Sequence, residues 1–170
     1  MSPSKRTTPR RKFLQILPLA LLAAFFLAAD PAEKDKDKDK AGDADKDKAA
    51  LKGKWEPTSS ESGGNKDDES EYKQFRVVFD GDKFTILKSG ETHMKGTFKL
   101  DASQTPKRID MTIEEGPDSD TKSKSLAGIY ELKDDELKWC FVPPDGGERP
   151  TSFTSQSGTS QILATLKREK

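Results

Sequence analysis

The chain has 170 residues, of which 35% are charged and 31% are hydrophobic, and this length suits one domain with appended segments. Its 30 basic and 30 acidic residues balance, but residues 1–29 hold five basic residues and no acid, so the remainder has a net charge of −5. A negative domain without a basic cluster lacks the cationic surface that phosphate backbones require, which argues against nucleic-acid binding.

Residues 1–29 are predicted to be an export signal. Basic residues that include Arg10 and Arg11 precede an apolar run over residues 13–29. This order is typical of secretory signals, and the twin arginine indicates the twin-arginine type. An uncleaved membrane anchor over residues 13–29 is the alternative, because Leu27 is larger than the small residue usual before a cleavage site. The folded part is therefore expected in the periplasm or outside the cell, with membrane contact only through this segment.

Residues 30–48 are predicted to be a disordered linker. They alternate Asp and Lys and, apart from Pro31, contain no apolar residue larger than alanine. Such a segment buries too little apolar surface to offset the entropy lost on ordering.

No metal site or other cofactor is predicted. The alternating aspartates over residues 43–47 resemble the start of a calcium loop, but Lys48 and Lys54 stand where that loop needs Gly and Glu. His93 is the only histidine, so a histidine cluster is excluded. It follows a turn, and we expect it at the surface.

Residues 49–170 are predicted to form an all-β domain, without a helix. Apolar and polar residues alternate over short segments, and turn motifs such as Asp80-Gly81-Asp82 separate them. Eight strands in sequential order favour an antiparallel up-and-down barrel, because closure removes exposed edges. The expected strands are Leu51–Pro57, Phe75–Phe79, Lys83–Leu87, Met94–Leu100, Ile109–Ile113, Leu126–Leu132, Glu136–Val142 and Gln161–Arg168.

Gly53-Lys54-Trp55, in the first expected strand, resembles the Gly-x-Trp signature of lipocalin-type barrels. Further matching stretches give the chain a resemblance to a family of small lipocalin-like domains in uncharacterised exported planctomycete proteins. The resemblance implies that Trp55 plugs the closed barrel end beneath a basic residue of the last strand, Arg168 or Lys167. The family has no established activity to carry over. The matching stretches are Leu51–Trp55, Phe79–Phe84, Gly96–Asp101, Gly128–Leu132, Leu137–Phe141 and Glu148–Phe153.

We expect a non-enzymatic barrel that binds a small apolar or anionic ligand in its interior or at its mouth. Candidate ligand contacts are Tyr130, Trp139 and Arg149. Arg149 suits an anion or carboxylate, but the favoured interpretation is structural, in which it brackets its loop by pairing with a local carboxylate. An eight-stranded barrel holds either side chains or one small ligand, and the sequence leaves both open. In lipocalin-type barrels the loop that follows the first strand lies over the open end. The polar stretch at residues 58–71 stands at this place and is interpreted either as a lid over a cavity or as a plain flexible loop.

The alternative function is a protein-interaction or inhibitor module of the cell envelope that works through the barrel loops. An enzyme is disfavoured, because the sequence has no nucleophile elbow and no phosphate-binding glycine loop. Cys140, the only cysteine, is expected to be buried on the face opposite Trp139, which separates it from His93 and disfavours a nucleophilic pair. The carboxylates over residues 114–120 flank a Gly-Pro turn and are interpreted as solvated.

Overall fold

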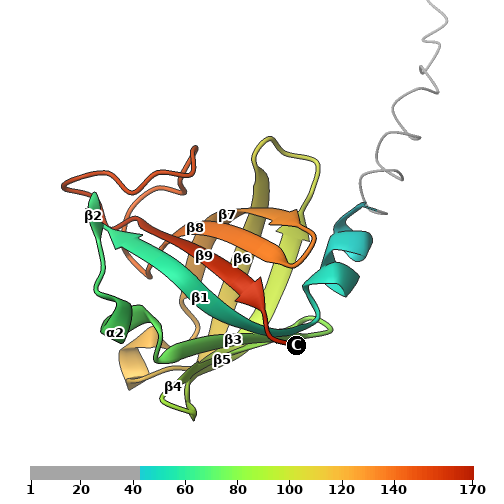
Figure 1. The fold of residues 1–170 in the computed structure, drawn as a ribbon, viewed down its shortest axis with the longest axis horizontal. Helices are drawn as coiled ribbons and strands as arrows, with labels where there is room; N and C mark the ends of the chain where they lie inside the picture. Colours follow the sequence, from blue (N-terminus) through green and yellow to red (C-terminus); the bar gives the residue numbers. More distant parts are fainter. Residues whose placement is uncertain (1–42) are drawn as a thin grey trace, which may run out of the picture. The chain divides into compact units, whose positions relative to one another are not determined.

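The computed structural model describes residues 43–170, which form a closed barrel of eight antiparallel strands and one short extra strand (Figure 1). Each barrel strand pairs with the next barrel strand in sequence, and pairing of the first with the last closes the barrel. The barrel strands are β1 (Gly53–Ser62), β3 (Phe75–Asp80), β4 (Lys83–Lys88), β5 (Glu91–Asp101), β6 (Lys107–Glu115), β7 (Ser125–Lys133), β8 (Glu136–Val142) and β9 (Ile162–Arg168). The extra strand is β2 (Asn65–Lys66), and two short helices are α2 (Glu69–Tyr72) and η1 (Ser119–Thr121).

The predicted all-β class and the antiparallel order of eight barrel strands are confirmed. Some details differ from the prediction. The first strand spans Gly53–Ser62 instead of Leu51–Pro57, and residues 43–51 are helical although the linker was predicted to continue to residue 48. The domain was also predicted to have no helix, but it contains α2 and η1. Residues 1–42, which hold the predicted signal and the rest of the linker, lie outside the described residues.

Alternate side chains of every barrel strand point into the interior, as the sequence pattern predicts. The register places Met111 beside both Phe98 and Leu126, and the rings of Phe79 and Phe98 meet edge to face with centroids 5.0 Å apart. Aromatic pairs favour this arrangement. These residues belong to one continuous buried core.

The helix over residues 43–51 covers one end of the barrel. Leu51 is fully buried in the core, and its carbonyl oxygen accepts a hydrogen bond of 2.8 Å from Trp55 Nε1. Asp47 accepts hydrogen bonds from Tyr130 Oη at 2.7 Å and from Lys107 Nζ at 2.6 Å. Local composition does not predict this helix, because Lys107 and Tyr130, which hydrogen-bond to Asp47, lie 60 and 83 residues from it along the chain.

Arg168, from the last strand, lies over the Trp55 ring at the same end. Its Cζ is 4.3 Å from the ring centroid, a distance at which cation–π attraction operates. The guanidinium also donates to the carbonyls of Ala50 and Lys52 and, through Nε, to Asp135 at 2.9 Å. This is the contact that the resemblance implies, and Arg168 makes it while Lys167 is exposed. A Cβ at Gly53, where φ is +127°, would stand 3.0 Å from Arg168 Nη1, which favours glycine at this position.

Within residues 43–170, no helix has the length and apolar composition required to cross a membrane.

Replacing Trp55 with alanine is expected to lower the free energy of unfolding by about 3–5 kcal/mol, the usual range for truncating a buried aromatic side chain. Denaturant unfolding followed by far-ultraviolet circular dichroism measures this change. Lys167→Ala, which removes the neighbouring exposed side chain, is the control and should change stability by less than about 0.5 kcal/mol. A loss below about 1 kcal/mol for Trp55→Ala would contradict its role as an anchor.

Candidate functional site

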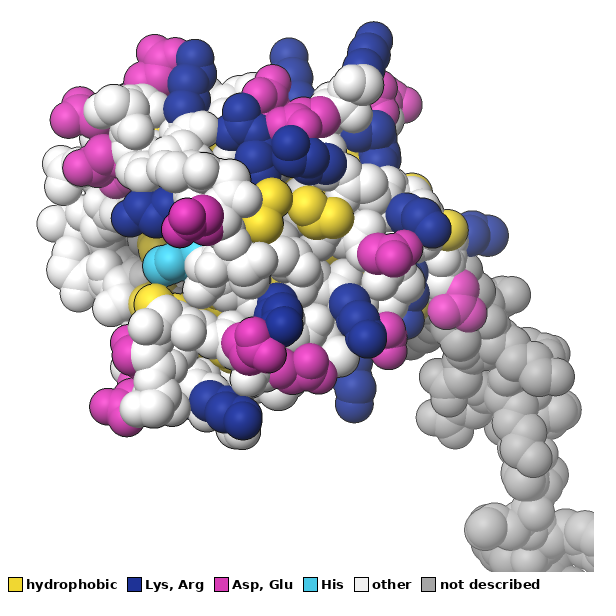
Figure 2. Space-filling view, turned by 90° about the horizontal axis from the view of Figure 1, so that it is seen from below, with side chains coloured by type: hydrophobic (Ala, Val, Ile, Leu, Met, Phe, Trp, Pro, Cys, Tyr) yellow, Lys and Arg dark blue, Asp and Glu magenta, His cyan; other side chains and the backbone are white. Residues whose placement is uncertain are grey.

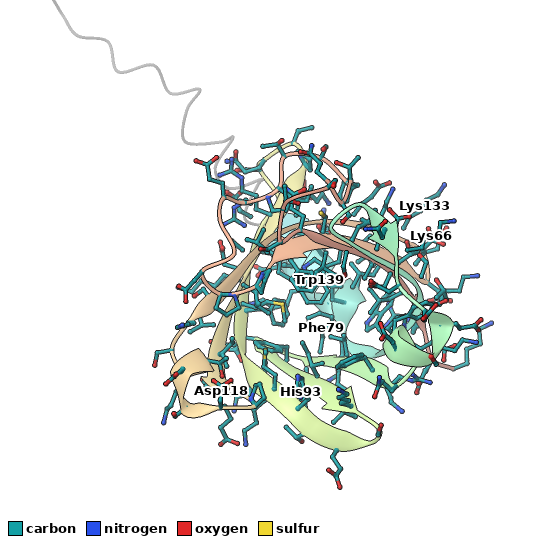
Figure 3. The ribbon with its side chains drawn as sticks, turned by 90° about the vertical axis from the view of Figure 1, so that its left-hand side faces the viewer. Lys66, Phe79, His93, Asp118, Lys133 and Trp139 are labelled. Atoms are coloured by element: carbon teal, nitrogen blue, oxygen red, sulfur yellow. The ribbon has the colours of Figure 1, made fainter. Side chains whose placement is uncertain are left out.

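A cavity of about 520 Å³ lies inside the other end of the barrel. Figure 3 shows Trp139 and Phe79 within the ring of strands and His93 on the β4–β5 side. The volume falls within the range of about 300–1,000 Å³ that is typical of ligand pockets. The sequence left open whether side chains fill the barrel interior or leave space for a ligand. The structure has both, since side chains pack one end of the interior and a cavity lies at the other end. The apolar lining includes Phe75, Val77, Ile86, Met94, Leu126, Trp139, Phe141, Ile162, Ala164 and Leu166.

The hollow arises from small side chains at inward-facing positions of two neighbouring strands. Ala164 of β9 pairs with Trp139 of β8 on one side and with Ser60 of β1 on the other. Ser62 follows on the same face of β1 and pairs with Ile162. Because the side chains of Ser60, Ser62 and Ala164 are small, they leave the interior beside them unfilled. Large aromatic side chains fill the interior at the closed end.

A β-bulge brings His93 to the edge of the cavity. Ile86 pairs with Met94 and Leu87 with Thr92, so His93 is the extra residue on β5. Bulges redirect side chains in this way and are enriched near functional sites. The imidazole is half-buried and meets the Phe75 ring edge to face at 5.8 Å, so the expected surface position is only partly correct. Alternation could not show this, because a bulge interrupts the period of two.

Lys88 also lies near the Phe75 ring. Its Nζ is 5.4 Å from the Phe75 centroid, and it also lines the cavity. Figure 2 shows the chain's single histidine at the surface, beside hydrophobic side chains and with basic and acidic side chains nearby. The β4–β5 hairpin thus contributes two nitrogen-bearing side chains to the rim of an apolar cavity.

The segment between β1 and β3 forms another part of the rim. Asp67 accepts hydrogen bonds from the hydroxyls of Ser60 at 2.5 Å and Ser62 at 2.9 Å, and Tyr72 Oη donates to the Thr58 carbonyl at 3.1 Å. Asp67, Glu71 and Tyr72 all line the cavity. The polar stretch expected to lie over the open end is therefore attached to β1 and borders the cavity there.

Of the three candidate ligand contacts, only Trp139 lines this cavity. Its ring stacks on Phe141 with centroids 4.2 Å apart. Its Nε1 is buried without a hydrogen-bond partner among the described residues, and a Cβ at Gly128 would stand 2.9 Å from that atom. The indole therefore rests against the bare backbone of Gly128, so that glycine is needed for the ring to adopt this position.

Tyr130 belongs to the closed end and not to the cavity. Its ring is buried, and its hydroxyl donates to Asp47, the residue that connects the helix over residues 43–51 to the barrel. Burial raises the pKa of the Tyr130 phenol, and the hydrogen-bonded Asp47 carboxylate raises it further. Tyr130 is thus neutral and acts as a hydrogen-bond donor that stabilises the closed end. It does not line the cavity, and its role as a ligand contact stays a prediction.

Arg149 fixes the β8–β9 connection to the outer wall of the barrel. Its Nη1 donates to the carbonyls of Ile109 at 3.1 Å and Gly128 at 2.7 Å, and its Nη2 pairs with Asp110 at 2.5 Å. It borders a separate outer groove of about 370 Å³ with Arg108 and Glu148. Both terminal nitrogens have protein partners, so the structure favours the bracketing alternative over anion binding.

Cys140 and His93 lie on opposite sides of the barrel wall. Cys140 is fully buried on the outer face of β8, and its Sγ is 3.6 Å from the carbonyl oxygen of Thr154 in the overlying loop. Burial raises the pKa of the Cys140 thiol, and a raised pKa lowers the thiolate fraction on which reactivity depends.

The remaining acidic residues considered in the sequence, at positions 114–120, are exposed. Glu115 pairs with Lys95 at 2.9 Å, and Asp118 accepts a hydrogen bond of 2.9 Å from the backbone of Thr121 at the start of η1. Within residues 43–170, no group of three or more His, Cys, Asp or Glu side chains is arranged to hold a metal ion.

Comparison of the chain with protein-family models, with curated proteins and with solved structures finds no match. The functional assignment therefore depends on the geometry of the cavity and its rim.

Cys140 is expected to react slowly with a thiol reagent in the folded protein, because it is buried and its thiol resists deprotonation. Labelling followed by mass spectrometry at neutral pH, with and without denaturant, measures the difference. Rapid native labelling that His93→Ala slows would contradict the separation of these two residues.

Proposed function

We propose that this chain is an exported, lipocalin-like, non-enzymatic module that binds one small and mainly apolar ligand inside the barrel. The cavity of about 520 Å³ with its apolar lining supports this function most directly. The proposed export rests on the basic and apolar N-terminal sequence, and the proposed lipocalin-like relationship rests on Gly53, Trp55 and Arg168.

The two ends of the barrel suit this role differently. The closed end is filled by Trp55, Leu51 and the helix over residues 43–51, so a ligand has no path through it. The cavity end is bordered by the segment from β2 to α2, the β4–β5 hairpin and the start of the β8–β9 connection. A ligand would enter between these segments and cover apolar surface, with a gain of about 25 cal/mol for each Å² removed from water.

A protein-binding module remains the second proposal. The observation that favours it is the long β8–β9 connection, which Arg149 fixes on the outer wall and in which the ring of Phe153 lies 5.4 Å from Lys138 Nζ. Loops held on a rigid barrel are suitable for protein recognition. This surface is separate from the cavity, so substitutions that fill the cavity distinguish the two proposals.

Ala164→Phe is expected to weaken binding of the fluorescent apolar probe N-phenylnaphthylamine at least about 10-fold, because a phenyl group at this position occupies the hollow. Probe fluorescence on titration measures the dissociation constant.

Thr85→Phe is the matched control, since Thr85 alternates with the inward-facing Phe84 and Ile86 and so points outward from β4. It should leave probe binding unchanged while adding the same side chain to the barrel. Equal probe binding by the native protein and Ala164→Phe, with both folded by circular dichroism, would contradict binding in the cavity.

A further inference from the structure

We propose that the ligand is a single-chain amphiphile whose head group is zwitterionic. This inference rests on the proposed function, because it assigns a head group to the ligand whose apolar part occupies the cavity. It arises from the charges on the rim, which have opposite signs on different segments.

The β4–β5 side of the rim suits the anionic part of a head group. Lys88 carries a positive charge, and His93, which reaches the rim through the β5 bulge, adds an N–H donor. Both side chains contact the Phe75 ring, Lys88 Nζ at 5.4 Å and the imidazole at 5.8 Å between centroids. One aromatic side chain thus holds an ammonium group and an imidazole at the same part of the cavity edge.

The β2–α2 side of the rim suits the cationic part. Asp67 and Glu71 contribute carboxylates to the cavity lining, and the aromatic ring of Tyr72 lies beside them in the sequence and lines the same cavity. The Tyr72 hydroxyl is held by the Thr58 carbonyl at 3.1 Å, which restrains the ring. Carboxylates together with an aromatic ring form the environment that quaternary ammonium groups prefer.

The charges at the rim are free to interact with a ligand. Among the described residues, neither Lys88 nor Glu71 takes part in an ion pair. Asp67 is hydrogen-bonded to two serine hydroxyls, which leaves its charge uncompensated. An external charge therefore does not have to displace an existing ion pair.

The rim carries both positive and negative charges, and this favours one class of head group over the others. A purely anionic head would approach Lys88 but face two carboxylates, and a purely cationic head would face Lys88. A neutral head would gain from neither side. A zwitterion with its anionic group toward Lys88 and His93 and its ammonium toward Glu71 and Tyr72 pairs with both, which is the electrostatic complementarity that confers specificity.

Binding of four amphiphiles that share a twelve-carbon chain tests this inference. They are dodecylphosphocholine, dodecanoate, dodecyltrimethylammonium and dodecyl maltoside, each titrated below its micelle concentration and followed by isothermal calorimetry. Native protein is expected to bind dodecylphosphocholine more tightly than the other three. Because Lys88 and Glu71 are exposed, each of these charges contributes a factor of about 2–5 in affinity, which decreases as salt is added.

Three variants assign the effect to the rim. Lys88→Gln should weaken binding of dodecylphosphocholine and dodecanoate and strengthen that of dodecyltrimethylammonium. Glu71→Gln should weaken binding of dodecylphosphocholine and dodecyltrimethylammonium and strengthen that of dodecanoate. Lys83→Gln is the control, because this exposed lysine lies at the opposite end of the same strand and should change none of the affinities.

The outcomes separate this inference from the function on which it rests. Binding of dodecyl maltoside and the other amphiphiles with equal affinity would overturn the zwitterionic head group and leave the cavity function standing. Tighter binding of dodecanoate or dodecyltrimethylammonium than of dodecylphosphocholine would also overturn it. Failure of all four to bind would contradict the proposed function itself.

Discussion

The stacking of Arg168 on Trp55 is the interaction on which the rest of this barrel depends. The two residues pair directly across β1 and β9, the strands whose pairing closes the barrel. The same guanidinium donates to the carbonyls of Ala50 and Lys52, which fixes the chain where it leaves the helix over residues 43–51. One contact therefore sets the closing register, fills one end and attaches the helix that covers it.

A closed end explains why the two ends of the barrel interior differ in chemistry. At the closed end large side chains interdigitate, and the polar atoms of Trp55 and Tyr130 have partners in the helix. At the other end Ser60, Ser62 and Ala164 leave space, and a bulge interrupts β5 at His93. The departures from a uniformly packed barrel are thus concentrated where we propose that the ligand binds, as is common at functional sites.

The alternation of side chains predicted most of the fold, because the inner face of most barrel strands is apolar, and it missed the second half of β1, where Ser60 and Ser62 face inward. The helix over residues 43–51 could not be predicted in this way. Its stability comes from Leu51 in the core and from Asp47, whose partners Lys107 and Tyr130 are remote in the sequence. Local composition identified an Asp and Lys repeat but could not indicate that one aspartate has a buried phenol as its partner.

The candidate site was less predictable than the fold, since residue type alone does not tell which end or face of a barrel a side chain occupies. Trp139 and Tyr130 pair with each other and share the inner face, yet one lines the cavity and the other contacts the helix. Arg149 has the chemistry of an anion site but uses it for Asp110 and two carbonyls. Lys88 and His93 share the β4–β5 hairpin, and Glu71 lies just before β3, but residue type alone does not indicate that these positions border a cavity.

Intermolecular nuclear Overhauser effects between labelled protein and bound N-phenylnaphthylamine test most directly the central claim that a ligand occupies the interior. The account predicts contacts from the probe to the methyl groups of Ile86, Met94 and Leu166, which line the cavity. Contacts confined to outward-facing methyl groups such as that of Leu163, the pairing partner of Cys140, would contradict it.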